Sequence, residues 1–249
     1  MESYSAFAQF YDAFTENVNY AQRAAYFDGL LLQHLGRRGL LLDLACGTGS
    51  LSVALSQLGY EVIGVDASPE MLSVAQQKAA SAGEHILFLH QRMETLDLFG
   101  TVAACVSALD SLNHLTSRYA LEKAIGRTAL FLEPGGVFVF DMNTPHKHKA
   151  VLANHCFVYE REKALCVWQN RTKGLLTDIT LDFFKEGIDT RYDRFGEQFS
   201  ERAYPLAEVD EIITKCGLTR IALYGDDTLL PPNLDAERWI FVCKKETSL

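Results

Sequence analysis

The stretch LLDLACGTGS, Leu41 to Ser50, decides the fold. Its apolar start is typical of a short buried strand, carries Asp43, and then opens into two glycines, Gly47 and Gly49. Glycines at the end of a strand let the backbone approach a ligand closely, because they carry no side chain. The loop is not a phosphate-binding P-loop, since no Gly-Lys-Ser/Thr sequence follows it.

The residues around the glycines narrow the choice of ligand. A dinucleotide fingerprint has a third small residue three positions after the second glycine, and Ser52 satisfies this requirement only weakly. Asp43 puts a carboxylate where a pyrophosphate would be repelled and a cation attracted. The stretch therefore favours a cationic ligand without phosphate over a dinucleotide.

The composition is that of an ordinary folded protein. The chain has 249 residues, 48% hydrophobic and 22% charged, which suits one domain with a modest insertion. Its net charge of −9 disfavours nucleic acid as a partner, because phosphate contacts need clustered Lys and Arg. Six scattered cysteines without a C-x-x-C pair predict reduced thiols in a cytoplasmic protein and no metal site. The sequence predicts neither a signal peptide nor a membrane span.

Short apolar runs alternate with helical patterns along the first part of the chain. Strands are expected at 40–45 and 61–66, within HILFLHQ and TVAACVSA, and at 134–143. Helices are expected between them, including one that begins at Ser68-Pro69 and one over 118–131. A further helix over 205–217 precedes two strands that would pair as a hairpin. This alternation predicts an α/β fold with a doubly wound, seven-stranded, mostly parallel sheet.

Two segments depart from this alternation. Residues 1–36 carry aromatic side chains at helical spacing, which predicts two helices that form an N-terminal lid. Residues 151–204 show partial alternation of aromatic and β-branched residues, which predicts an inserted cap of three or four antiparallel strands. The main domain would then comprise residues 37–150 and 205–249.

The sequence D-x-A-x-G-x-G, from Asp43 to Gly49, resembles the first motif of class I S-adenosylmethionine-dependent methyltransferases. VIGVDAS agrees, because it puts Asp66 at the tip of the second strand, 19 residues after Gly47. In that family the glycines let the backbone pass close to the cofactor, and the second carboxylate accepts the ribose hydroxyls. The resemblance implies a Rossmann-like fold, S-adenosyl-L-methionine as cofactor, and SN2 transfer of a methyl group to an O or N nucleophile.

The resemblance also implies a set of cofactor-binding residues, in which one position departs from the family. Arg92 stands where the family often has an Asp that accepts a hydrogen bond from the adenine amino group. An Arg cannot accept that bond, but it could stack on the ring, or Glu94 could replace the missing carboxylate. The implied residues are Tyr11, Asp43, Ala45, Gly47, Gly49, Asp66, Ala67, Met71, Arg92, Met93, Ala108 and Leu109.

Tyr11 has two interpretations, core packing of the N-terminal helices or closure of the lid over the cofactor. Asp110 and His114 follow the fourth strand and are the candidate catalytic residues, which would orient the acceptor or remove its proton. The ordinary alternatives are a helix N-cap for Asp110 and a surface histidine for His114. Many such transfers need no strong base, because the methyl group is already activated and positioning supplies much of the rate.

Three features after residue 143 invite an interpretation as well. The run HKHK, residues 146–149, is interpreted as a solvated loop, since it has no carboxylate or cysteine partner nearby in the sequence. Phe199 stands where a similar stretch of the family often has a histidine. Arg202 would bind an acidic acceptor group or form an ion pair. Asn143 ends the fifth strand, at the sheet edge where ligands bind, or is a turn residue.

The sequence thus predicts a methyltransferase that acts on a small-molecule acceptor, as a monomer or homodimer, without nucleic acid or membrane partners. Three alternatives remain open. The chain could bind S-adenosylmethionine without transferring the methyl group, it could methylate tRNA or protein, or it could be a dinucleotide-dependent oxidoreductase.

Overall fold

The computed structural model describes residues 18–161, 164–187, 191–225 and 228–247. Its centre is a seven-stranded sheet with the order β10-β11-β5-β4-β1-β2-β3. The five strands from β5 to β3 are parallel, and β11 joins them antiparallel on one side with β10 as its hairpin partner. The strands are β1 (Leu40–Leu44), β2 (Glu61–Asp66), β3 (Leu87–His90), β4 (Val102–Ser107), β5 (Leu132–Asn143), β10 (Leu218–Gly225) and β11 (Arg238–Lys245).

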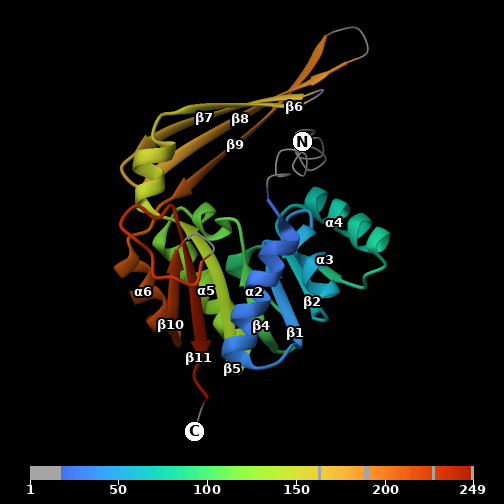
Figure 1. Ribbon diagram of the computed structural model, residues 1–249, viewed down its shortest axis with the longest axis vertical. Helices are drawn as coiled ribbons and strands as arrows, with labels where there is room; N and C mark the ends of the chain where they lie inside the picture. The colour runs from blue at the N-terminus through green and yellow to red at the C-terminus, as the bar shows by residue number, and fades with distance from the viewer. Residues whose placement is uncertain (1–17, 162–163, 188–190, 226–227, 248–249) are drawn as a thin grey trace.

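Helices cover both faces of this sheet (Figure 1). Side chains from α2 and α3 pack with one face of the strands, and side chains from α5 and α6 pack with the other. Leu41 and Leu42 belong to opposite clusters, as the two-residue period of a strand requires. The helices are α2 (Tyr20–Leu35), α3 (Ser50–Gln57), α4 (Pro69–Ala82), α5 (Arg118–Phe131) and α6 (Leu206–Lys215), with single turns η1 (Met93–Thr95), η2 (Ser111–His114) and η3 (Lys147–Leu152).

Local sequence explains where the helix after β2 begins and ends. The Ser68 hydroxyl accepts a hydrogen bond from the Met71 amide at 3.1 Å, and Pro69 takes the first helical position. Gly83 ends α4 in the left-handed conformation, at φ 72°. α4 therefore begins directly after Asp66, and this keeps the tip of β2 short and fixed.

A second sheet follows β5 and returns to the main domain at α6. It has four antiparallel strands in the order β6-β7-β8-β9 and lies above the end of the main sheet toward which β5 runs (Figure 1). We call this sheet the cap. Its strands are β6 (Cys156–Arg161), β7 (Ala164–Lys173), β8 (Leu176–Glu186) and β9 (Tyr192–Arg202).

The observed fold confirms the prediction of a doubly wound, mostly parallel sheet with an inserted antiparallel β-sheet. The predicted hairpin of the last two strands is also present as β10 and β11. Residues 1–17 of the predicted N-terminal lid, Tyr11 among them, lie outside the described residues, and most of the remainder forms α2. Among the described helices, none is both long and apolar enough to cross a membrane.

Candidate active site

The loop after β1 is shaped by three residues with left-handed backbones. Ala45, Gly47 and Gly49 have φ of 60°, 54° and 72°. A Cβ atom added to Gly47 would meet nothing within 4 Å, so the backbone there faces open space. A Cβ atom on Gly49 would lie 2.8 Å from the Cβ of Ala75 in α4. Gly47 thus leaves room for a ligand, whereas Gly49 also allows α3 and α4 to pack closely.

Asp66, at the end of β2, ties this loop to the next strand. Its carboxylate accepts hydrogen bonds from the Gly47 amide at 2.8 Å and from the Ser68 amide at 2.9 Å. Burial raises the pKa of Asp66, while these amides and the charge of His114 lower it. The side chain is only partly buried, so an oxygen atom can receive further donors such as hydroxyl groups.

Asp43 supports the loop from inside the protein. The residue is 1% exposed, and its carboxylate accepts a hydrogen bond from the Ser52 hydroxyl at 2.5 Å. Burial raises its pKa to about 7, against the Ser52 hydrogen bond that lowers it. Ser52, which only weakly fits a dinucleotide fingerprint, thus has a definite role as the partner of this carboxylate.

The segment after β3 contains Arg92, at the position where the family often has an Asp. Arg92 precedes η1 and pairs with Glu94 at 3.1 Å, and its side chain is 69% exposed. Met93 is partly buried and packs against the main core. Met71, in the first turn of α4, is 8% exposed. The Ala67 carbonyl oxygen lies 2.9 Å from the Nε2 atom of His90.

The loop after β4 also has left-handed residues, but these are not glycines. Leu109 and Asp110 have φ of 57° and 54°, a conformation that is costly for residues with a side chain. Their amides donate to the two oxygens of the Asp141 carboxylate, at 2.9 and 2.6 Å. Asp141, in β5, is fully buried and holds the loop in this strained form.

Two arginines neutralise this buried carboxylate. Arg23 of α2 pairs with Asp141 at 3.0 Å. Arg238 of β11 pairs with Asp141 and, at 2.8 Å, with Asp110. Burial disfavours ionisation of Asp110, but Arg238 and Lys147 outweigh it and lower its pKa. Asp110 takes the N-cap position of η2, as the ordinary alternative has it, but its side chain makes no capping hydrogen bond and belongs to this charge network.

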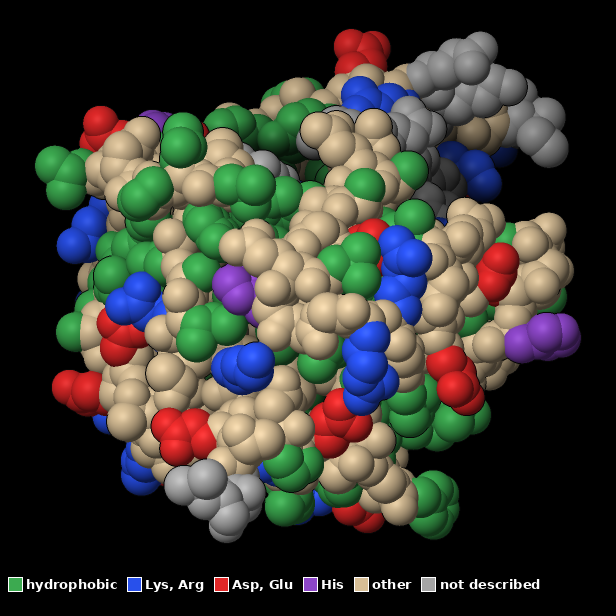
Figure 2. Space-filling view, turned by 60° about the horizontal axis from the view of Figure 1, so that its bottom comes forward, with side chains coloured by type: hydrophobic (Ala, Val, Ile, Leu, Met, Phe, Trp, Pro, Cys, Tyr) green, Lys and Arg blue, Asp and Glu red, His purple; other side chains and the backbone are tan. Residues whose placement is uncertain are grey.

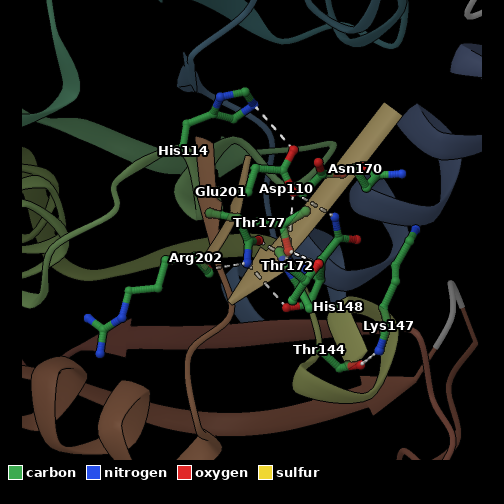
Figure 3. A network of polar contacts seen from close by, with 12 residues as sticks. Asp110, His114, Thr144, Lys147, His148, Asn170, Thr172, Thr177, Glu201 and Arg202 are labelled. Atoms are coloured by element: carbon green, nitrogen blue, oxygen red, sulfur yellow. Dashed lines mark hydrogen bonds and ion pairs between the residues drawn. The ribbon is translucent and has the colours of Figure 1, made fainter. Parts of the chain in front are cut away.

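His114 and Glu201 meet Asp110 under the cap. The Nε2 atom of His114 lies 3.9 Å from Glu201 Oε1, and the ligand-type atoms of all three residues lie within 4.8 Å of one another (Figure 3). His114 comes from η2 and Glu201 from the end of β9. Burial lowers the pKa of His114, although Asp110 and Asp66 raise it, so the ring is predominantly neutral at pH 7. We call these three residues the acceptor cluster.

Glu201 is the most unusual member of the cluster. It is 4% exposed, and within the described part of the chain no Arg or Lys side chain forms an ion pair with it. His148 Nε2 lies 3.7 Å from Glu201 Oε2, and the Asn143 amide donates to the same oxygen at 3.4 Å. Burial, with a further contribution from Asp110, raises the pKa of Glu201 to about 8.

Three sequence interpretations are settled by these contacts. His148 is fully buried and its Nδ1 lies 2.8 Å from the Thr177 hydroxyl, so a solvated HKHK loop is wrong for this residue. Arg202 pairs with Glu208 at 3.0 Å and points away from the acceptor cluster in Figure 3, so the ion-pair alternative holds. Asn143 is buried at the end of β5, and its backbone amide donates a hydrogen bond to the Asn113 side-chain carbonyl at 2.9 Å, so it is not merely a turn residue.

Sequence reasoning missed Asp141, Arg238, Glu201 and His148. A signal existed for Asp141, since a carboxylate inside the apolar run VFVFDMN is costly unless it is paired. Glu201 gave no local signal, because it is one of several acidic residues in an alternating strand. Its role depends on which residues the cap brings against η2.

The first loop fits S-adenosylmethionine, a cationic nucleoside without phosphate. Open space beside Gly47 admits a ligand, and Asp66 presents a partly exposed carboxylate next to it. The fold and this loop together are those of an α/β protein suited to a nucleoside cofactor at the ends of β1 and β2.

Comparison with known proteins gives the family. A family model described as "Methyltransferase domain" matches residues 41–136 of the chain. The chain is 32% identical to the provisionally named methyltransferase YqeM of Bacillus subtilis (strain 168), over 99% of this chain and 98% of that protein. A crystal structure of an S-adenosylmethionine-dependent methyltransferase from Clostridium acetobutylicum ATCC 824 is 27% identical, covers 98% of this chain and 99% of its own, and has a TM-score of 0.90.

The name of a third relative states which acceptors that protein methylates. Glycine/sarcosine N-methyltransferase from Halorhodospira halochloris is 25% identical over 255 residues, which cover 95% of this chain and 87% of that protein. The chain belongs to the class I S-adenosylmethionine-dependent methyltransferases, and S-adenosylmethionine is its methyl donor.

Proposed function

We propose that the protein transfers the methyl group to an O or N nucleophile of a small molecule bound between the donor loop and the cap. One observation carries this proposal. β2 and β4 both flank β1 in parallel, so Asp66 at the end of β2 and His114 after β4 belong to the same edge of the sheet, and each shifts the pKa of the other; this supports an acceptor cluster near the carboxylate expected to bind the donor's ribose. The solvent-reachable, neutral ring of His114 would therefore lie at the boundary between a donor side at β1 and β2 and an acceptor side under the cap.

Bound S-adenosylmethionine supplies a methyl group already activated for displacement. The protein's own residues then have to bind, orient and exclude water. The Gly47 backbone and Asp66 would hold the donor, with Asp43 supporting the loop, and Met71, Met93 and Arg92 would surround the adenine. Ala108 and Leu109 would face the methyl group, and Asp110 and His114 would orient the acceptor.

A small acceptor is favoured over tRNA or protein for two reasons. The cap lies directly over the acceptor cluster, and concave, covered sites suit small ligands. Acidic and basic side chains are interspersed on the face in Figure 2, without the basic stripe that phosphate contacts need. All six cysteines are free thiols, which supports a reducing, cytoplasmic setting, and we propose a monomer or homodimer there.

The test is formation of S-adenosylhomocysteine from S-adenosylmethionine in the presence of a small-molecule library, with bulk tRNA and unfolded protein as parallel acceptors. We expect turnover only with members of the small-molecule library. Turnover with tRNA or protein alone would replace the proposed acceptor class. Tight binding of S-adenosylhomocysteine without turnover in any arm would favour a protein that binds the nucleoside but transfers nothing.

A further inference from the structure

Glu201 is a buried carboxylate that lacks a cationic partner, and this calls for an explanation. Its direct contacts are two imidazole rings and one amide, which are neutral near pH 7, while Lys147 and Arg238 act on it without forming an ion pair. A buried charge is normally paired, because removing an ion from water costs on the order of several kcal/mol. The Nε2 atom of His148 is buried as well and has no hydrogen-bond partner within the described residues.

A positive charge would also be attracted by the rest of the cluster. Asp110 adds a second carboxylate within reach of Glu201, and the pKa of Asp110 is lowered, so this group is ionised. Arg238 is shared between Asp110 and Asp141, and Arg23 also pairs with Asp141. These two arginines face three carboxylates when Glu201 is ionised. Lys147 also lowers the pKa of Asp110 and of Glu201, but its ion pair is with Glu237, at 4.0 Å.

The spacing of the cluster can be compared with the spacings expected around an ammonium group and around a metal ion. An ammonium group that donates three hydrogen bonds of normal length would hold its acceptors about 4.6 Å apart, by tetrahedral geometry. Ligands of a tetrahedral metal with bonds near 2.1 Å would lie only about 3.4 Å apart. The His114–Glu201 distance of 3.9 Å lies between these two values, and all three atoms lie within 4.8 Å of one another, so the cluster admits an ammonium group and the Mn²⁺ experiment below tests the metal ion.

We propose that the acceptor is an amine, which binds as an ammonium group among Asp110, His114 and Glu201 and gives its proton to Glu201. This inference rests on the proposed function, because it names the acceptor class of the same site. The ring of His114 packs in a tilted arrangement against Phe199, with ring centroids 4.9 Å apart, which helps to hold the imidazole beside Glu201.

The proton and electron balance is simple. The ammonium group passes one proton to the Glu201 carboxylate, and a neutral acid and a neutral amine result. The nitrogen lone pair then forms the new bond to the methyl carbon, and the electrons of the broken carbon–sulfur bond remain on sulfur. The methylated nitrogen carries the positive charge, and the former sulfonium becomes a neutral thioether.

The groups that face Glu201 come from every element around it. Asp110 and His114 lie beside η2, Lys147 and His148 come from η3, Asn143 ends β5 and Arg238 begins β11. Burial and Asp110 raise the pKa of Glu201 to about 8, against Asn143, Lys147 and Arg238. A carboxyl group with such a pKa is well matched to an ammonium donor near neutral pH.

The experiment compares wild type with Glu201→Gln and with Glu160→Gln, an exposed control on β6 of the cap. Small primary and secondary amines, each paired with its hydroxyl counterpart, are tested for binding to the S-adenosylhomocysteine-loaded protein and for methylation. We expect amines to bind and to be methylated in preference to their counterparts. Glu201→Gln should lower kcat/KM by about 100-fold or more, the usual worth of a proton-transfer group.

The pH profile separates a proton acceptor from a merely structural residue. In wild type, kcat/KM should rise with pH through the pKa of Glu201, and in Glu201→Gln this rise should be absent. S-adenosylhomocysteine affinity and thermal stability should match those of Glu160→Gln, which shows that the variant is folded.

Three results would overturn the inference. Methylation of hydroxyl compounds but not amines would leave the proposed function intact and reject the amine. Amines that neither bind nor react would reject it even if RNA or protein were methylated. Binding of one Mn²⁺ per chain, lost in Glu201→Gln and required for turnover after chelation, would assign the cluster to a metal ion instead.

Discussion

Two loops at the same edge of the sheet, residues 45–49 after β1 and residues 108–114 after β4, adopt left-handed backbones by different means. The first uses glycines, for which this conformation carries no steric cost, at two of its three left-handed positions, and Ala45 at the third. The second uses Leu109 and Asp110, and its strained amides are held by the remote carboxylate of Asp141. The conformation of the first loop is therefore encoded in its local sequence, whereas that of the second depends on a residue at least 31 positions away.

The largest effect should come from breaking the anchor of the second loop. Asp141→Ala leaves Arg238 buried without this partner and leaves two amides without their acceptor. We expect the free energy of unfolding to fall by about 3–5 kcal/mol, the usual cost of breaking a buried ion pair. Urea denaturation measures this change.

The matched control is Glu211→Ala, which removes a surface ion pair with Arg118 at 2.9 Å. Exposed pairs contribute little, so its free energy of unfolding should stay within about 1 kcal/mol of wild type. Equal losses in the two variants would mean that Asp141 does not anchor the loop after β4.

The anchor of the first loop should matter for binding more than for folding. Asp66→Ala removes the acceptor of the Gly47 amide and the carboxylate predicted to bind the ribose. We expect binding of S-adenosylhomocysteine to weaken by about 1.5–3 kcal/mol, the value of hydrogen bonds to a charged group. Isothermal titration calorimetry measures it, with the exposed Asp97→Ala as control, and unchanged affinity would remove Asp66 from the site.

The smallest effect, and the sharpest test of the glycine loop, is Gly47→Ala. A Cβ atom there meets no neighbour within 4 Å, so the left-handed backbone alone should cost about 1–2 kcal/mol of stability. Gly36→Ala is matched to it, since Gly36 has φ 79° and open space at the end of α2. Both variants should lose similar stability, but only Gly47→Ala should lose affinity for S-adenosylhomocysteine; equal affinities would contradict a ligand beside Gly47.

The contrast between the loops explains what the sequence could predict. The alternation of strands and helices, the caps of α4 and the hairpin of β10 and β11 follow from local patterns, and the structure confirms them. The donor side was equally accessible, because Asp43, Gly47 and Asp66 lie within one strand–helix–strand unit. Their contacts fit that prediction, although the binding roles stay predictions.

The acceptor side could not be predicted in the same way. Asp110 and His114 were selected from their position after β4, but their partners lie in β9, β11 and η3. His148 was assigned to solvent because the charged run HKHK is hydrophilic as a whole, whereas the turn η3 buries one of its four side chains. Burial of a single residue inside a polar run is decided by tertiary packing, which no local pattern records.

Glu201 joins the cluster from the inserted cap, while Asp110 and His114 belong to the main domain. If the acceptor binds at this cluster as proposed, a single substitution in β9 alters the charge offered to it and leaves every residue of the glycine loop unchanged. For protein evolution, this separation means that a lineage can change its substrate by drift in one strand while inheriting the same donor chemistry. For protein engineering, it makes β9 the first strand to randomise.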